Sequence, residues 1–285
     1  MSSPAPPPGD FYRTVLLLLR AAGVPYLVGG AYALERYTEI ARDTKDLDVF
    51  VRPADCPPAL DLLAAAGYRA ELTFPHWLGK VLAGDQVVDV IFSSGNGIAQ
   101  VDDLWFEHAV EAEVVGVPVR LCPPEEMIWS KAFVMERERF DGADVAHLLR
   151  ACGPALDWRR LLRRFGPRWR VLLAHLVLFG FIYPGEHRQV PPGLVRELAR
   201  RLDTETIAPA AGERVCRGTL LSRAQYLVDV EAWGYADARL ADPATMAAAD
   251  VRSWTEAIEG DVPSTLAGSG PRRGDSGGGA AGGAG

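Results

Sequence analysis

The stretch TKDLDVFV, residues 44–51, sets two carboxylates among alternating apolar residues. Successive side chains of a strand point to opposite faces, so Asp46 and Asp48 share one face, roughly 7 Å apart. The stretch VVDVIF, residues 87–92, repeats the alternation around Asp89. We therefore predict strands over residues 47–51 and 86–92 that present three carboxylates from one small sheet.

A glycine pair precedes these strands in the stretch YLVGGAYAL, residues 26–34. The pattern predicts a short strand over residues 26–28, a turn at Gly29 and Gly30, and then a helix. Without side chains in the turn, phosphate oxygens can approach backbone N–H groups at the helix start, where the helix dipole favours an anion. The alternative is an ordinary turn, which a double glycine also makes.

The three aspartates offer the oxygen ligands that magnesium prefers, and magnesium is commonly held by a few carboxylates together with substrate phosphates. We therefore predict that Asp46, Asp48 and Asp89 bind Mg²⁺ and act as the catalytic carboxylates. The alternative is the solvated face of an antiparallel strand, which shows the same alternation. The four cysteines form no CxxC motif and the five histidines show no metal-ligand spacing, so no zinc site is predicted.

The chain is predicted to be α+β, with a small mixed sheet flanked by helices and followed by a helical domain. The expected divisions are a disordered N-terminus over 1–9, the sheet domain over 10–122, the helical domain over 123–262 and a disordered glycine-rich tail over 263–285. Further strands are predicted over 68–74, 77–83 and, with a break, 110–121. Helices are predicted over 11–22, 31–37, 58–66, 124–139, 142–151, 158–165, 168–181 and 194–202, and residues 213–240 have no assignment.

Composition limits the partners and the compartment. A formal net charge of −7 argues against a generally basic nucleic-acid-binding surface. Six arginines between Trp158 and Arg170 could grip RNA, or they could form a solvated basic helix face. The N-terminus has no signal-peptide pattern, and the apolar run over 171–183 is shorter than the ~20 residues that a bilayer requires. A cytoplasmic protein without a membrane partner is expected.

The glycine pair, the paired aspartates and the third aspartate resemble the motifs of the polymerase-β nucleotidyltransferase superfamily. The next stretch, PPEEMIWSKAFVMERERFDGADVAHLL (residues 123–149), resembles the lysine and aspartate motifs of the AbiEii-like toxin nucleotidyltransferases. This resemblance implies use of a nucleoside triphosphate (NTP) with magnesium, and it implies roles near the phosphates for Lys131 and Asp144. Without it, Lys131 reads as a solvated helix residue and Asp144 as a helix cap.

The resemblance implies transfer of a nucleoside monophosphate from an NTP, such as ATP, to an acceptor that the sequence does not identify. RNA, protein and small molecules are all acceptors within the superfamily, and the arginine run favours RNA slightly. Many members carry serine where this chain has Gly30. The alternative is therefore a catalytically inactive nucleotide-binding or antitoxin-like module of the same fold.

Overall fold

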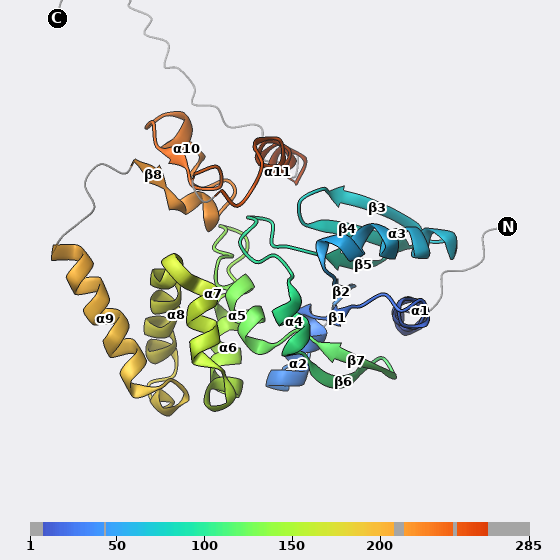
Figure 1. The fold of residues 1–285 in the computed structure, drawn as a ribbon, viewed down its shortest axis with the longest axis horizontal. Coiled ribbons are helices and arrows are strands. Elements are labelled where there is room, and N and C mark those ends of the chain that lie inside the picture. The colour runs from blue at the N-terminus through green and yellow to red at the C-terminus, as the bar shows by residue number, and fades with distance from the viewer. Residues whose placement is uncertain (1–7, 43, 208–213, 242–243, 262–285) are drawn as a thin grey trace, which may run out of the picture.

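The protein is described by a computed structural model that covers residues 8–42, 44–207, 214–241 and 244–261. Its centre is a seven-stranded mixed sheet in the order β3-β4-β5-β2-β1-β7-β6 (Figure 1). The strands are β1 (Leu27–Val28), β2 (Asp46–Phe50), β3 (Arg69–Phe74), β4 (Leu78–Ala83), β5 (Gln86–Ile91), β6 (Val110–Val114) and β7 (Val117–Leu121). The predicted α+β class, with a mixed sheet flanked by helices and followed by a helical region, is confirmed.

Strand β2 lies inside the sheet, antiparallel to β1 and parallel to β5. Its alternation sends Leu47 and Val49, both 0% exposed, into the core. Asp46 and Asp48, which alternate with them, therefore point the other way. On the core side, α1 (Pro8–Ala21) and α3 (Cys56–Ala65) contact each other and strands of the sheet. The apolar half of β2 therefore fixes the direction of its acidic half.

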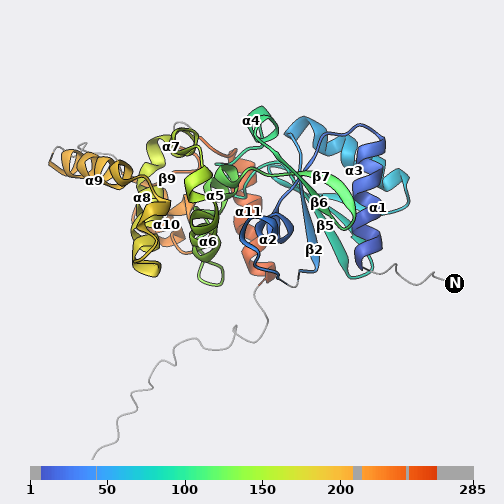
Figure 2. The ribbon, with the colours of Figure 1, turned by 90° about the horizontal axis from the view of Figure 1, so that it is seen from below.

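Helix α2 (Gly30–Thr38) contacts both β2 and α6 (Gly142–Cys152), and so joins the sheet to the helical region (Figure 2). The other helices are α4 (Asp103–Glu107), α5 (Pro124–Lys131), α7 (Trp158–Phe165), α8 (Trp169–Ile182), α9 (Pro192–Ile207), α10 (Leu227–Glu231) and α11 (Ala248–Asp261). All strands of the large sheet precede residue 122 and α5 begins at Pro124. The domain boundary near Cys122 remains a prediction.

Two sequence expectations need correction. The helix predicted over 124–139 ends at Lys131, after which the chain reverses through a bridge between Met135 and Phe140. The reversal brings Asp141 back to Lys131, a contact that a continued helix would prevent. Helix α1 begins at Pro8, so the predicted disorder over 1–9 is wrong for its last two residues. The rest of that stretch and the predicted tail over 263–285 lie outside the described residues.

Residues 214–261, for which the sequence predicts no individual helix or strand, form several elements. They contain a two-stranded parallel sheet of β8 (Val215–Cys216) and β9 (Ala236–Asp237), followed by α11 beside β3 (Figure 1). Trp254 of α11 packs against Gly95, where a Cβ would come within 2.6 Å of the indole, and its ring centroid is 5.3 Å from that of Trp77. The end of the described chain therefore returns to the strands of the large sheet.

The arginine run is divided between the inside of the protein and its surface. Arg159, Arg163 and Arg170 are exposed, as the interpretation of a solvated face expects, whereas Arg160 and Arg164 form ion pairs away from solvent. Arg160 pairs with Glu125 and lies 3.7 Å from Glu126, while Arg164 bonds Glu126 at 3.1 Å and Asp102 at 2.6 and 2.7 Å. Arg160 and both glutamates are at most 5% exposed in their side chains. Arg160 and Arg164 are therefore unavailable to RNA.

One helical stretch of the described chain, Trp158–Ile182, is long and apolar enough by composition to cross a membrane. Its α8 half sends one face into the core, including His175, whose Nε2 lies 2.9 Å from the carbonyl oxygen of Ala132. Its α7 half carries the buried arginine pairs. These contacts are those of a core helix.

The substitution Arg160→Met is expected to lower the free energy of unfolding by about 3 kcal/mol, because it leaves Glu125 and Glu126 buried with too little positive charge. The matched control is Arg163→Met on the exposed side of the same helix, which should change stability by less than about 0.5 kcal/mol. Urea denaturation measures both. Equal effects would contradict the role assigned to the buried pairs.

Candidate functional site

The structure brings the three predicted aspartates together. Parallel pairing of β2 and β5 sets Asp48 opposite Asp89, and Asp46 lies two residues before Asp48 on the same face. One carboxylate oxygen from each aspartate lies within 4.8 Å of the other two. Three oxygens at such spacing can share one divalent cation. No ligand softer than oxygen belongs to this cluster.

Burial and mutual repulsion dominate the electrostatics of the cluster. Burial and the neighbouring charges of Asp46 and Asp89 raise the pKa of Asp48 to about 7. Burial also raises the pKa of Asp89, although Lys80 opposes this by donating from Nζ to Oδ1 at 2.9 Å. Crowded, partly buried carboxylates repel one another unless a positive charge intervenes. The donor set therefore fits a hard divalent ion such as Mg²⁺.

The glycine turn lies directly against this cluster. The N–H of Gly29 donates to the carbonyl of Asp48 at 3.0 Å, and a Cβ on Gly29 would overlap the ring of Phe50. Gly30 opens α2 with φ +55°, and a Cβ there would overlap the carboxylate of Asp48. A serine at position 30 is therefore incompatible with this placement of Asp48. The glycine that departs from the superfamily pattern has a local structural cause.

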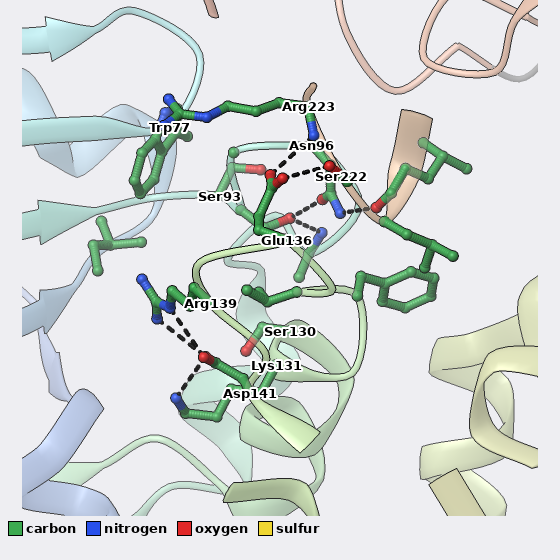
Figure 3. Close-up of a pocket in the computed structure, with 18 of the residues that line it drawn as sticks. Trp77, Ser93, Asn96, Ser130, Lys131, Glu136, Arg139, Asp141, Ser222 and Arg223 are labelled. Atoms are coloured by element: carbon green, nitrogen blue, oxygen red, sulfur yellow. Dashed lines mark hydrogen bonds and ion pairs between the residues drawn. The ribbon is translucent and has the colours of Figure 1, made fainter. Parts of the chain in front are cut away.

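A cavity of about 440 Å³ opens beside the aspartates. Its lining includes Gly30 and all three carboxylates, together with Trp77 and Trp254. Lys131, Arg139 and Asp141 also line it, and Figure 3 shows them grouped on one side. Acidic, basic and aromatic groups thus face one cavity.

Lys131 lies in the cavity wall but is already paired. Its Nζ is 3.0 Å from Asp141 Oδ2 and 2.8 Å from Asp144 Oδ2. Asp144 also accepts a hydrogen bond from Arg42. Burial alone would raise the pKa of Asp144, but the charges and hydrogen bonds of these two cations hold it below its usual range. Asp144 is therefore an ion-pair partner, and its predicted capping bond is absent from the contacts of the described residues.

Sequence reasoning missed two parts of the site. Lys80 could have been found, because a hairpin turning at Gly84 and Asp85 sets residue 80 opposite residue 89, as the strand register has it. The wall formed by residues 219–224 could not, because its contacts are distant in sequence. Asn96 Nδ2 donates to the carbonyl of Leu220 at 2.6 Å, and Glu136 accepts from the N–H of Arg223 at 2.9 Å (Figure 3).

Comparison with protein families gives one match. The family described as "Uncharacterised nucleotidyltransferase" matches residues 12–175, more than half of the chain. The matched range contains the glycine turn, the three carboxylates and Lys131, and it ends before the wall at residues 219–224. No curated protein matches.

Solved structures give distant likenesses. The antibiotic-resistance factor ANT(2'')-Ia is 18% identical, with a TM-score of 0.40 over 59% of this chain and 95% of its own. The lincosamide antibiotic adenylyltransferase LnuA is 15% identical, with a TM-score of 0.36 over 51% and 98%. JHP933 from Helicobacter pylori is 11% identical, with a TM-score of 0.34 over 71% and 100%.

The pH dependence of stability follows from the raised pKa of Asp48. Its pKa of about 7 lies above the ordinary 3.8, so without metal the folded state loses stability as pH rises from about 4 to 7. Asp48→Asn removes that loss. The variant is expected to melt at least about 3 °C above the wild type at pH 8, with no difference near pH 4. Thermal melts in EDTA measure this, and an equal difference at both pH values would contradict it.

The overlap at Gly30 gives a second expectation. Gly30→Ala should displace the Asp48 carboxylate and weaken Mn²⁺ binding at least about tenfold, since one of three ligands moves. The matched control is Gly116→Ala, which has a comparable φ of +74° but open space around its Cβ. Metal titration followed by electron paramagnetic resonance distinguishes the two. Equal Mn²⁺ affinity in both variants would show that the overlap is relieved without moving Asp48.

Proposed function

We propose, from the premise that the chain belongs to the family of uncharacterised nucleotidyltransferases, that it transfers a nucleoside monophosphate from an NTP to a hydroxyl acceptor with magnesium. The observation that carries the proposal is the convergence of Asp46, Asp48 and Asp89 beside the turn at Gly29 and Gly30. Family membership supports the reaction class, and the carboxylate cluster supports the metal.

In the proposed reaction, the acceptor oxygen forms a bond to the α-phosphorus while the bond from that phosphorus to the bridging oxygen breaks, and pyrophosphate leaves. Magnesium, held by the three aspartates, supplies charge neutralisation and a lower pKa for the attacking hydroxyl. Asp89 is suited to bind the ion or to take the hydroxyl proton at Oδ2, because Lys80 occupies its Oδ1. Backbone N–H groups at the start of α2, at the turn of Gly29 and Gly30, would bind the phosphates.

The cavity favours a small hydroxylated acceptor over RNA. Residues 219–224 and Trp254 line the same cavity of about 440 Å³ as the carboxylates, which limits the size of the acceptor. Two of the six arginines that suggested RNA, Arg160 and Arg164, are paired inside the helical region. ATP is proposed as one nucleotide donor and the cytoplasm as the compartment, both on the sequence alone. Closer kinship to the AbiEii-like toxin enzymes is likewise proposed, supported by the pairing of Lys131 with Asp144.

The rival proposal of an inactive nucleotide-binding or antitoxin-like module rested on Gly30. The overlap between a Cβ at Gly30 and the Asp48 carboxylate accounts for this glycine without loss of activity. A pure binding module also has no evident need for three carboxylates that repel one another. The active enzyme is therefore the better-supported proposal.

Transfer of label from α-labelled NTPs to a small-molecule extract with Mg²⁺ tests the proposed activity. Asp89→Asn is expected to reduce label transfer by at least about 100-fold, because it removes a metal ligand or the proton acceptor. The matched control is Asp85→Asn, an exposed carboxylate in the turn before β5, which should retain wild-type transfer.

Two outcomes decide between the proposals. Label in a small-molecule product that depends on Asp89 would support both the reaction and the acceptor class. Magnesium-dependent NTP binding without transfer to small molecules, RNA or protein would favour the inactive module.

A further inference from the structure

The resemblance assigns phosphate contact to Lys131, yet the contacts of Lys131 point to another task. Its side chain is 16% exposed, and two of its three donors are directed at carboxylates that are themselves at most 9% exposed. Moving the ammonium group toward a substrate would remove a cation from Asp141 and Asp144 together. Breaking a buried pair is strongly unfavourable. The ammonium group of Lys131 therefore stays with Asp141 and Asp144 and does not bind a substrate phosphate.

Arg139 also contacts the carboxylate of Asp141, and it has N–H groups that Asp141 does not use. Its Nε donates to Asp141 Oδ1 at 2.9 Å and its Nη2 donates to Oδ2 at 3.0 Å, so the guanidinium is held by a bidentate pair of hydrogen bonds. The side chain is nevertheless 69% exposed. Two of its five N–H groups are used, and among the described residues no acceptor contacts Nη1. These two hydrogen bonds fix the orientation of the guanidinium and leave its free edge, at Nη1, without an acceptor among the described residues.

The free edge belongs to the cavity that contains the aspartates. Arg139 lines the cavity with Gly30 and Asp48, and Figure 3 shows its guanidinium extending away from the Lys131 side of Asp141. The guanidinium of Arg139 therefore faces the same cavity as the proposed metal site.

We propose that Arg139 binds the triphosphate of the NTP, and that Lys131 acts one step behind it by holding Asp141 in place. The inference rests on the proposed nucleotidyltransferase function. A guanidinium presents parallel N–H groups that match two phosphate oxygens, a fit that an ammonium group lacks. The chain Lys131–Asp141–Arg139 then fixes a phosphate-binding arginine on the wall beside the glycine turn.

Titration calorimetry with each of the four ribonucleoside triphosphates and MgCl₂ tests the proposal. Arg139→Gln is expected to raise the Kd of the bound NTP about 10- to 100-fold, the range for loss of a hydrogen bond between charged groups. It should leave the Kd of the corresponding nucleoside unchanged, because the nucleoside has no phosphates. Arg139→Lys should bind NTP with intermediate affinity, since it retains the charge and loses the two-point geometry.

The matched control is Arg137→Gln. Arg137 is exposed on the same turn and does not line the cavity, so NTP affinity should stay within about twofold of wild type. Lys131→Met should lower the melting temperature by at least about 3 °C, because it leaves Asp141 and Asp144 short of positive charge.

Wild-type affinity for NTP in Arg139→Gln would overturn the inference and leave the proposed function standing. An unchanged melting temperature with lost NTP affinity in Lys131→Met would also overturn it, in favour of direct phosphate contact by Lys131. If the wild-type protein binds none of the four triphosphates, the proposed function fails and the inference fails with it.

Discussion

Repulsion among three carboxylates is the constraint on which the site depends. The parallel register of β2 and β5 sets Asp48 opposite Asp89. Buried Leu47 and Val49 on β2, and buried Val88 and Val90 on β5, prevent either strand from turning its acids elsewhere. Around this cluster, Lys80 bonds Asp89, while the charges of Lys131 and Arg139 act on Asp48. The fold therefore maintains a concentration of negative charge that only a cation can fully relieve.

A second charge system, largely buried, joins the sheet region to the helices. Glu126 is 0% exposed and meets both Arg160 and Arg164, and Arg164 continues to Asp102, which is 46% exposed at the start of α4. Removing Glu126, Arg160 or Arg164 would leave a buried charge short of its partner, so the system ties the helices to the loop between the sheet strands. The two systems differ in kind: the helical one is neutralised within the protein, whereas the aspartate cluster is not.

Local patterns predicted the parts of the site that local chemistry defines. Alternation placed the three aspartates on one face, and the glycine pair marked a turn against them, as the structure has it. A hairpin turn at Gly84 and Asp85 also contains the register that pairs Lys80 with Asp89, although the sequence prediction did not use it. The end of α5 at Lys131 was missed, because the ion pair that accompanies the reversal lies ten residues away at Asp141. Helical periodicity carries no information about such a contact.

The wall at residues 219–224 and Trp254 is held to the sheet region by contacts from more than eighty residues away in the sequence, so no short motif encodes it. It also lies beyond the range that the family match covers. The matched range contains every carboxylate and cation that the proposed chemistry uses, but not residues 219–224 and Trp254 of the cavity lining. Family membership therefore constrains the reaction more tightly than the acceptor, because part of the cavity that the proposed acceptor would enter is formed by residues outside the match.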